Sequence, residues 1–530
     1  MDFADKEFTY EGTTSDFDDI FVWENVIVLV EYTTKRNGHS EHLKKKHFLY
    51  DKIVSDTSKF ATFLSSKSED FTKSSASKYH VSKLQFRIIY CTTTDPDEDL
   101  KKQINYVKFY DYPTAMYFKA LTSSIKKSAR SEMLDFLDVE FEDAGENCHT
   151  TSGVSRDPFK GSLLPESHSN LGSEYKVVSF YISPEALLER AYVLRKEGWR
   201  DSEWLYQRLI SQSKIDSIRS YLNSKGRVFL NNIIVTLPSS CRLVDEYDKT
   251  IDSSGLHKTV PATIQIPKKF NTIGLIDGQH RVFSYHEGGR YDDKIGPLRK
   301  RLNLLVTGII YPDEISEQDR VKFEAEIFLE INSNQTGAKS DLKHAISSII
   351  TPYDPTSIAK RVLTRLNRSG AAADIFVKYF YDKTRLKTTT VISYGVRHLV
   401  NLTADGPLFS RWNHPEKQKL LESGKSAELL DQYVEYCFHE IRRWLDRVKA
   451  NSAPDQWQIK TKDGSGVLNT TTIIGFLNYF RIALSKGIEM NESSYDKILV
   501  GISTFQYGDY KSSQYAAMAR KMNDLYYPNE

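Results

Sequence analysis

A group of polar residues at a predicted strand-to-helix corner contains the side chains best suited to chemistry. Residues 273–289 read IGLIDGQHRVFSYHEGG, where an apolar run stops at Asp277-Gly278 and apolar periodicity resumes after Arg281. A plain turn needs only the Asp and the Gly. Gln279 and His280 add hydrogen-bonding groups, and Arg281 can bind a phosphate or carboxylate with two parallel hydrogen bonds. The pattern therefore indicates a site.

The expected geometry of this corner favours an anionic ligand. A helix that starts after a tight turn presents free backbone N–H groups, which attract anions. Gly278 lets the backbone approach a ligand closely, and Asp277 could hold a metal-bound water, a ribose hydroxyl or the helix start itself. The structural alternative stays open, in which Asp277 caps the helix and Arg281 forms only a surface ion pair.

Two further polar clusters lie on predicted helices before and after this corner. The segment FLEINSNQTGAKSDL (328–342) ends an apolar helix in amide side chains, which are costly to bury without partners. The segment YQRLISQSKIDSIRSYL places an adjacent Gln and Arg on a predicted helix, two turns before a lysine. The residues of the two clusters are Asn332, Asn334, Gln335 and Lys339, and Gln207, Arg208 and Lys214.

The order of these motifs resembles the DGQHR-domain family, which includes the DndB proteins of phosphorothioate DNA-modification systems. The resemblance spans about residues 175–400 and implies a ParB/sulfiredoxin-like α+β fold with a helical C-terminal region. It also implies that a nucleoside triphosphate is bound and hydrolysed. Carried over, it assigns catalysis to Asp277, Gln279, His280 and Arg281, and nucleotide binding to Gly278, Arg208, Asn332 and Gln335. No GxxxxGK[ST] motif occurs, which excludes a P-loop NTPase.

The N-terminal stretch DIFVWENVIVLVEYT resembles the core hairpin of Mrr-like PD-(D/E)xK nucleases, which are restriction-endonuclease-like α/β domains. In that family two carboxylates bind Mg²⁺ and a lysine orients the attacking water. The resemblance assigns the metal ligands to Asp19 and Glu31. Thr33 stands at the lysine position, so the domain is expected to be either a DNA-binding relative that does not cut or a nuclease in which Lys35, on the same strand face as Glu31, could replace that lysine and Glu11 could supply another acid.

Two basic stretches of the N-terminal part are candidates for DNA contact. They read HLKKKH (42–47) and IKKSAR (125–130), and such stretches can follow a phosphate backbone. Each is also what a solvated helix face looks like. Double-stranded DNA is therefore an expected partner, whether or not the nuclease-like part cuts it.

Apolar patterning predicts the elements that position these groups. Strands are expected at 19–23, 26–33, 83–92, 104–111, 176–183, 228–237, 263–267, 271–277 and 302–311. Helices are expected at about 41–64, 113–138, 184–198, 201–223 and 313–334, and throughout most of the chain after 340. The expected domains are 1–143 (nuclease-like), 176–400 (DGQHR) and 401–530 (helical), with 144–175 as a Gly/Ser/Pro-rich linker or an extended segment on a neighbour.

Composition indicates a globular protein of several domains. The 530 residues carry a net charge of +2, so wholesale nucleic-acid binding is not indicated. The four cysteines are scattered without a CxxC pair, which speaks against a zinc site or a disulfide framework. No signal peptide or membrane span is apparent, so a cytoplasmic location is expected.

The expected function is therefore an NTP-binding and NTP-hydrolysing protein of a DNA-modification or phage-defence system, with Mg²⁺ as the expected cofactor. Two alternatives stay open. One is a non-catalytic DNA-binding regulator of such a system, and the other is a Mg²⁺-dependent endonuclease with a DGQHR sensor. Expected partners are DNA, a nucleotide and other defence proteins, and the chain could self-associate.

Overall fold

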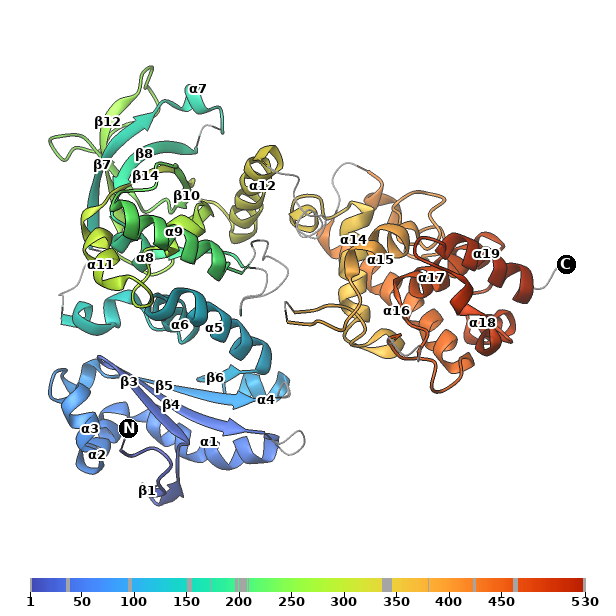
Figure 1. Ribbon diagram of the computed structural model, residues 1–530, viewed down its shortest axis with the longest axis horizontal. Coiled ribbons are helices and arrows are strands. Elements are labelled where there is room, and N and C mark those ends of the chain that lie inside the picture. Colours follow the sequence, from blue (N-terminus) through green and yellow to red (C-terminus); the bar gives the residue numbers. More distant parts are fainter. Residues whose placement is uncertain are drawn as a thin grey trace. The chain divides into compact units, whose positions relative to one another are not determined.

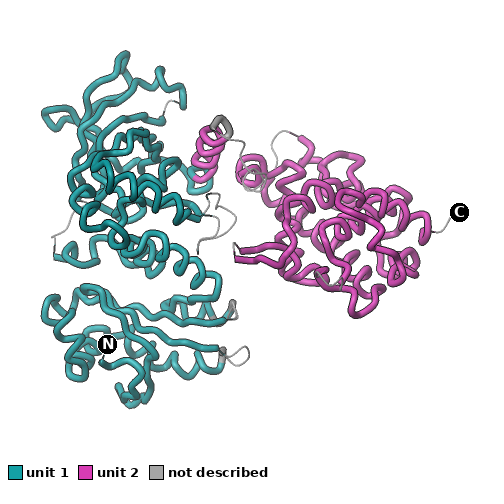
Figure 2. The backbone as a smooth tube through the Cα atoms, viewed as in Figure 1, with its two compact units in different colours: residues 1–320 teal, residues 321–530 magenta. Residues whose placement is uncertain are grey.

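The computed structural model describes two compact units, residues 1–320 and 321–530 (Figure 2). The described residues are 2–34, 39–93, 98–149, 155–172, 174–195, 199, 207, 209–335, 346–379, 381–422, 426–460 and 466–527. Unit 1 is mixed α/β and contains the sheets, and the described part of unit 2 is helical (Figure 1).

The first sheet of unit 1 has four strands in the order β3-β4-β5-β6. They are β3 (Asp19–Trp23), β4 (Val26–Thr33), β5 (Gln85–Thr92) and β6 (Val107–Tyr110). β3 and β4 form the predicted antiparallel hairpin, with Glu24 at a φ of 53° in its turn. β5 pairs in parallel with β4, and β6 pairs in parallel with β5. Parallel neighbours need a crossover connection, which is usually helical.

Helices supply the crossovers and the cover of this sheet. The crossover elements are α1 (His39–Ser55), α2 (Thr57–Lys67) and α3 (Glu69–Phe71), then α4 (Glu98–Gln103). A short hairpin of β1 (Phe8–Tyr10) and β2 (Thr13–Ser15) precedes the sheet. The helix predicted at 113–138 is interrupted at Lys126, whose φ is 49°. It forms α5 (Tyr112–Ile125) and α6 (Arg130–Phe136), joined by a 3₁₀ turn.

The second sheet of unit 1 has eight strands in the order β11-β12-β7-β8-β14-β10-β13-β9. Its strands are β7 (Arg156–Leu164), β8 (Lys176–Ile182), β9 (Ala191–Tyr192), β10 (Ile233–Leu237), β11 (Arg242–Val244), β12 (Val260–Pro267), β13 (Ile273–Asp277) and β14 (Leu304–Ile310). Only the β10–β14 and β13–β9 pairs are parallel among these strands. Its helices are α7 (Glu166–Ser169), α8 (Pro184–Arg190), α9 (Gln212–Lys225), α10 (Gln279–Phe283) and α11 (Asp292–Arg301).

The predicted linker 144–175 contains a strand of this sheet. β7 pairs along its length with β12 and also pairs with β8, and Leu163 is fully buried. Sequence patterning misses β7 because Pro158 and Gly161 interrupt it. Val26, Val30 and Ile89 of the first sheet belong to the same apolar core as the second sheet. Residues 1–320 therefore form one compact unit. The predicted domain boundaries at 143, 175 and 400 do not coincide with the boundary between the two compact units, which lies after residue 320.

The two helices predicted before the corner are shorter than expected. α8 ends at Arg190 because the next two residues form β9, which pairs with β13. Gly274 of β13 makes this approach possible, since a Cβ there would lie 2.6 Å from the Tyr192 hydroxyl. Of the helix predicted at 201–223, α9 begins at Gln212; among the described residues before it, 209–211 are not helical and the Gln207 backbone pairs with residues 194–195.

Unit 2 is organised around the long amphipathic helix α16 (Ala427–Asn451). Its Trp444 is fully buried, donates from Nε1 to the carbonyl of Phe476 at 3.0 Å, and stacks on Phe480. The other helices are α14 (Pro355–Leu366), α15 (Thr388–Tyr394), α17 (Thr470–Ser485), α18 (Glu492–Leu499) and α19 (Tyr515–Tyr526), and α12 (Glu317–Gln335) crosses the unit boundary. The predicted helical character after residue 340 is confirmed for the described part of that region.

Candidate functional site

The residues 277–281 form the strand–turn–helix corner that the sequence predicts. β13 ends at Asp277, and Gly278 has a φ of 104°, a conformation that favours glycine. The Gly278 carbonyl accepts hydrogen bonds from the N–H groups of Arg281 (2.9 Å) and Val282 (3.0 Å). α10 has only five residues, so its N-terminus alone provides little attraction for an anion.

Arg281 binds groups of the protein itself. Its Nη2 lies 2.6 Å from Oδ2 of Asp277, and its Nη1 donates to the carbonyl of Asn232 at 2.6 Å. The pair therefore ties the end of β13 to the segment before β10. The ion pair of the structural alternative is present, but Asp277 does not cap the helix, because the N-cap residue of α10 is Gly278 and no side chain makes a capping hydrogen bond. A phosphate would have to compete with Asp277 for the guanidinium.

His280 is held as a neutral ring. Its Nε2 accepts a hydrogen bond from the backbone N–H of Ser211, the N-cap residue of α9, at 3.1 Å. Burial, reinforced by the charges of Lys214 and Arg195, lowers the pKa of His280 to about 4. Because the Nε2 lone pair is engaged, the ring positions α9 and is poorly suited to accept a proton from a substrate.

Two side chains at the corner, Gln279 and Arg195, have buried polar atoms that make no hydrogen bond to the described residues. Oε1 of Gln279, and Nε and Nη2 of Arg195, have no hydrogen-bond partner among the described residues. Gln279 and Phe283 are one helical turn apart, and the guanidinium of Arg195 lies 5.3 Å from the centre of the Phe283 ring. Such unpaired groups cost free energy unless something binds them.

Arg195, which the sequence analysis did not single out, connects the corner to the helices of the N-terminal part. Its side chain is 1% exposed, and its Nη1 donates to Glu132 Oε2 at 2.6 Å and to the Tyr117 hydroxyl at 3.2 Å. The Tyr117 hydroxyl in turn donates to Glu132. Although burial lowers the pKa of Arg195, Tyr117 and Glu132 more than compensate, so the guanidinium stays charged.

Arg219 of α9 fixes the loop that follows α10. Its buried guanidinium donates to the carbonyls of four loop residues at 2.7–3.0 Å, namely Ser284, His286, Gly288 and Arg290. A sequence signal for this role exists, because Arg219 lies on the apolar stripe of α9 between the buried Ile215 and Leu222. A charged residue on such a stripe needs internal partners.

None of the other residues predicted to bind nucleotide is among the described residues of unit 1. Arg208 lies outside the described residues. Asn332 belongs to unit 2, and its amide donates to the Phe328 carbonyl one turn earlier on α12 at 2.8 Å. Gln335 is the last residue of that helix. Gln207 does reach the corner, where its amide donates to the Leu275 carbonyl at 2.6 Å.

The two predicted metal ligands of the nuclease-like part lie on opposite faces of the first sheet, so the prediction of a shared Mg²⁺ site is wrong. Asp19 pairs directly with Val30, and paired residues point to the same face. Glu31, the next residue, points to the other face. The Asp19 carboxylate instead accepts a hydrogen bond from the Tyr32 hydroxyl at 2.9 Å.

Glu31 belongs to a different polar cluster that includes a lysine from α1. Lys46 Nζ lies 2.9 Å from Glu31 Oε2 and 2.7 Å from Asp16 Oδ1, and His42 Nε2 lies 3.4 Å from Glu31 Oε1. Lys35 lies outside the described residues. Glu11 pairs with Lys59 rather than with this cluster. The predicted basic stretch 42–47 thus points at least one lysine inward.

Burial governs the charge of this cluster. Burial raises the pKa of Glu31 to about 7, although Lys46 opposes the shift through its hydrogen bond and charge. The pKa of Lys46 is raised, because its bonds to Asp16 and Glu31 outweigh burial, which lowers it. Near neutral pH, the charged Lys46 therefore lies beside the Glu31 carboxyl group, which is protonated in part of the molecules and ionised in the rest. That pairing suits proton transfer.

The second predicted basic stretch, 125–130, has structural partners. Arg130 stacks on the Trp23 ring at 4.7 Å and lies 3.6 Å from the carboxylate of Glu287. The backbone N–H of Lys127 donates to the carbonyl of Glu287, and Ser128 accepts from that residue's N–H. These contacts join the helices of the N-terminal part to the loop after α10.

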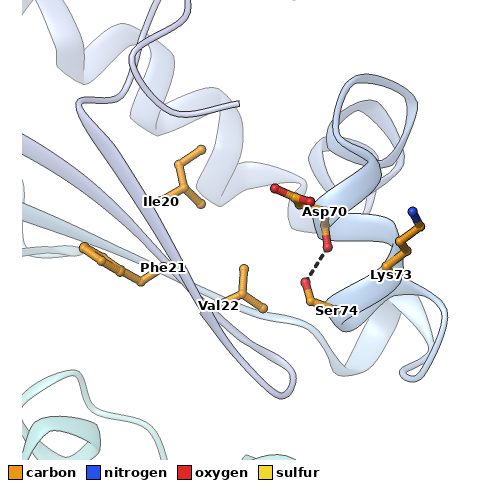
Figure 3. A pocket seen from close by; sticks show the side chains of 6 residues that line it. All are labelled: Ile20, Phe21, Val22, Asp70, Lys73 and Ser74. Carbon is orange, nitrogen blue, oxygen red and sulfur yellow. Dashed lines mark hydrogen bonds between the residues drawn. The ribbon is translucent and has the colours of Figure 1, made fainter. Parts of the chain in front are cut away.

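A surface pocket of about 500 Å³ next to β3 carries none of these residues. Figure 3 shows its lining side chains, Ile20, Phe21, Val22, Asp70, Lys73 and Ser74, with the Ser74 hydroxyl donating to the Asp70 carbonyl. Within the described residues, no group of three or more His, Cys, Asp or Glu side chains is placed to hold a metal ion.

Comparisons with known proteins give no match. No protein-family model, curated protein or solved structure matches the chain. In the part of the chain that the structure describes, no helix has the length and apolar character needed to cross a membrane. The resemblance to DGQHR and nuclease-like families thus rests on the motifs alone.

The geometry of His280 makes a pH-dependent prediction. The unfolded chain binds a proton at His280 near the ordinary histidine pKa, about 6.5, whereas the folded ring resists protonation down to about pH 4. This contribution to stability is complete above about pH 6.5 and is lost as the pH falls through 4. NMR titration of ring-labelled histidine should show His280 neutral at pH 5, and protonation near 6.5 would contradict the hydrogen bond to Ser211.

Proposed function

We propose that the corner at residues 277–281 binds a nucleoside triphosphate and hydrolyses it, in a protein that acts on or with DNA in a modification or phage-defence system. The resemblance to the DGQHR family motivates the proposal. It also leads us to propose a ParB/sulfiredoxin-like fold for the second sheet and its helices, and a restriction-endonuclease-like fold for the first.

One electrostatic observation carries the proposal. Burial is the largest cause of the lowered pKa of His280, and three nearby cations, Lys214, Arg195 and Arg281, lower it further, whereas Asp277 opposes them. Arg195 and Arg281 have carboxylate partners, whereas Lys214 is exposed and has no ion pair among the described residues. A surplus cation beside buried, unpaired hydrogen-bonding groups favours a phosphate-bearing ligand.

The unpaired groups define the roles that we propose. Arg195 has Nε and Nη2 available as donors, and Gln279 offers an amide whose oxygen has no donor among the described residues. Because Oε1 of Gln279 is buried, ligand entry requires a local rearrangement of the corner. In the rearranged corner, Arg281 would exchange Asp277 for a phosphate, and the released Asp277 carboxylate could orient water.

The variant Gln279→Leu separates a ligand-binding role from a structural one. Removing an unpaired buried amide should leave stability unchanged or raise it. If the amide binds nucleotide, the same change should weaken binding of ATP, GTP or CTP by about tenfold or more. We would measure nucleotide binding and phosphate release with Mg²⁺, with and without DNA, beside the denaturation midpoint.

Gln265→Leu on β12 is the matched control, because Gln265 is also partly exposed and lies on a strand that four others separate from β13 and the corner. It should leave binding and phosphate release unchanged. If the parent protein neither binds nor hydrolyses any of the three nucleotides, the proposal is wrong. A non-catalytic DNA-binding regulator would then be the better account.

A second candidate function, a Mg²⁺-dependent nuclease, is favoured by the position of Lys46. This lysine places an ammonium group between Glu31 and Asp16, although the strand itself has Thr33 at the lysine position. Asp16 and Glu31 are the carboxylates that would hold Mg²⁺, and Lys46 would have to release them in part to do so. Lys46 would then orient the attacking water.

The proposed nuclease site and the one predicted from sequence differ in whether Asp19 is needed, so substitutions can separate them. Glu31→Gln and Lys46→Met should abolish Mg²⁺-dependent nicking of supercoiled plasmid, whereas Asp19→Asn should retain it because Asp19 lies on the opposite face. Loss of nicking in Asp19→Asn, with folding intact, would contradict the site around Lys46. Absence of nicking by the parent protein would remove this candidate function.

A further inference from the structure

Unit 2 contains a cavity of about 530 Å³ whose lining is unusually rich in cationic and polar groups. The cavity lies among the first turn of α14, the 3₁₀ turn at Val396–His398, the loop that follows this turn, and α17. Its lining residues are Pro355, Arg397, His398, Asn401, Thr403, Asp405, Gly406, Pro407 and Arg481.

The two arginines of this cavity lack the carboxylate partners that several other arginines of unit 2 have. Arg365 on α14 lies 3.2 Å from Glu435, and Arg447 on α16 lies 2.6 Å from Asp496. By contrast, neither Arg397 nor Arg481 forms an ion pair or a side-chain hydrogen bond within the described part of the unit. Their positive charge is therefore left for solvent or a ligand.

Both guanidinium groups lie close enough to His398 to affect its imidazole. Burial, then Arg481 and Arg397, lower the pKa of this imidazole. Asp405 is the one carboxylate among the lining residues, and it forms no ion pair with either arginine in the described residues. Two cations thus face one carboxylate and a neutral imidazole, which leaves the cavity with an excess of positive charge.

Two other features of the lining suit an anion. Pro355 is the first residue of α14, a helix of twelve residues, so the partial positive charge of that helix start adds to the two arginines. Asp354 caps this helix by accepting from the Thr356 N–H at 2.7 Å, which satisfies one of its free donors and leaves others. Asn401 and Thr403 provide neutral hydrogen-bonding groups at the same wall.

We propose that this cavity binds a small phosphorylated molecule, with the phosphate between Arg397 and Arg481. Planar guanidinium groups bind phosphate oxygens with paired hydrogen bonds, and two unpaired arginines provide two such forks. The volume falls within the range of small-ligand sites, about 300–1,000 Å³. A concave site of that size encloses a small ligand, whereas a nucleic-acid duplex is too wide to enter it.

Titration of the full chain with inorganic phosphate and pyrophosphate tests the proposal. Calorimetry follows the binding, and the arginine variants of this cavity assign it, because changing Arg397 or Arg481 leaves the proposed phosphate-binding groups of the corner in unit 1 intact. We expect pyrophosphate to bind more tightly than phosphate, and Arg397→Gln or Arg481→Gln to weaken it by about tenfold or more. Arg520→Gln, which changes an exposed arginine of α19 outside the cavity, is the matched control and should bind normally.

The pKa of the His398 imidazole provides a second measurement, which responds to a bound anion and not to a general loss of folding. A bound anion favours the protonated ring, so the pKa of His398 should rise when pyrophosphate is added to the folded protein. Binding that survives both arginine changes, or that leaves the His398 resonance unmoved, would overturn the proposal. Binding of a single-stranded oligonucleotide without binding of pyrophosphate would also overturn it, in favour of a nucleic-acid surface.

Discussion

The buried charge of Arg195 is the constraint on which the arrangement of unit 1 depends. A guanidinium removed from water is tolerated only when a carboxylate and hydrogen-bond acceptors replace its hydration. Glu132 and Tyr117 provide that replacement from α6 and α5, while Phe283 of α10 provides the aromatic face. Two parts of the chain that are far apart in sequence, the consecutive helices α5 and α6 and the helix α10, are therefore fixed around one side chain, and α10 carries part of the DGQHR motif.

In the structure, the residues of the motif have roles that differ from those suggested by the sequence. Arg281 and His280, which sequence reasoning assigned to chemistry, are bound to Asp277, Asn232 and Ser211 and hold the corner together. The groups left for a ligand are those with incomplete hydrogen bonding, Gln279 and Arg195. Scaffolding and ligand binding are thus divided between different residues of one short motif and its neighbours.

Local sequence patterns predicted the strands well and the sites poorly, for physical reasons. The bounds of β3 and β4 follow from β-branched runs on either side of a two-residue turn. That turn also places Asp19 opposite Val30, so the separation of Asp19 from Glu31 was predictable from the hairpin alone. The approach of Lys46 to Glu31 was not, because it depends on how α1 packs on the sheet. β7 was missed because Pro158 and Gly161 interrupt its strand pattern, and its strand structure depends on pairing with β8 and β12.

Hydrogen exchange of the full chain, with and without ATP and Mg²⁺, tests the central claim most directly, because it locates the ligand. If the corner binds nucleotide, backbone amides of 275–284 and of 211–219 should exchange more slowly, by about tenfold at saturation. The two segments should respond together, because His280 bonds to Ser211 and Arg219 bonds to the loop after α10. Unchanged exchange in both segments at saturating nucleotide, or protection confined to other parts of the chain, would contradict the account.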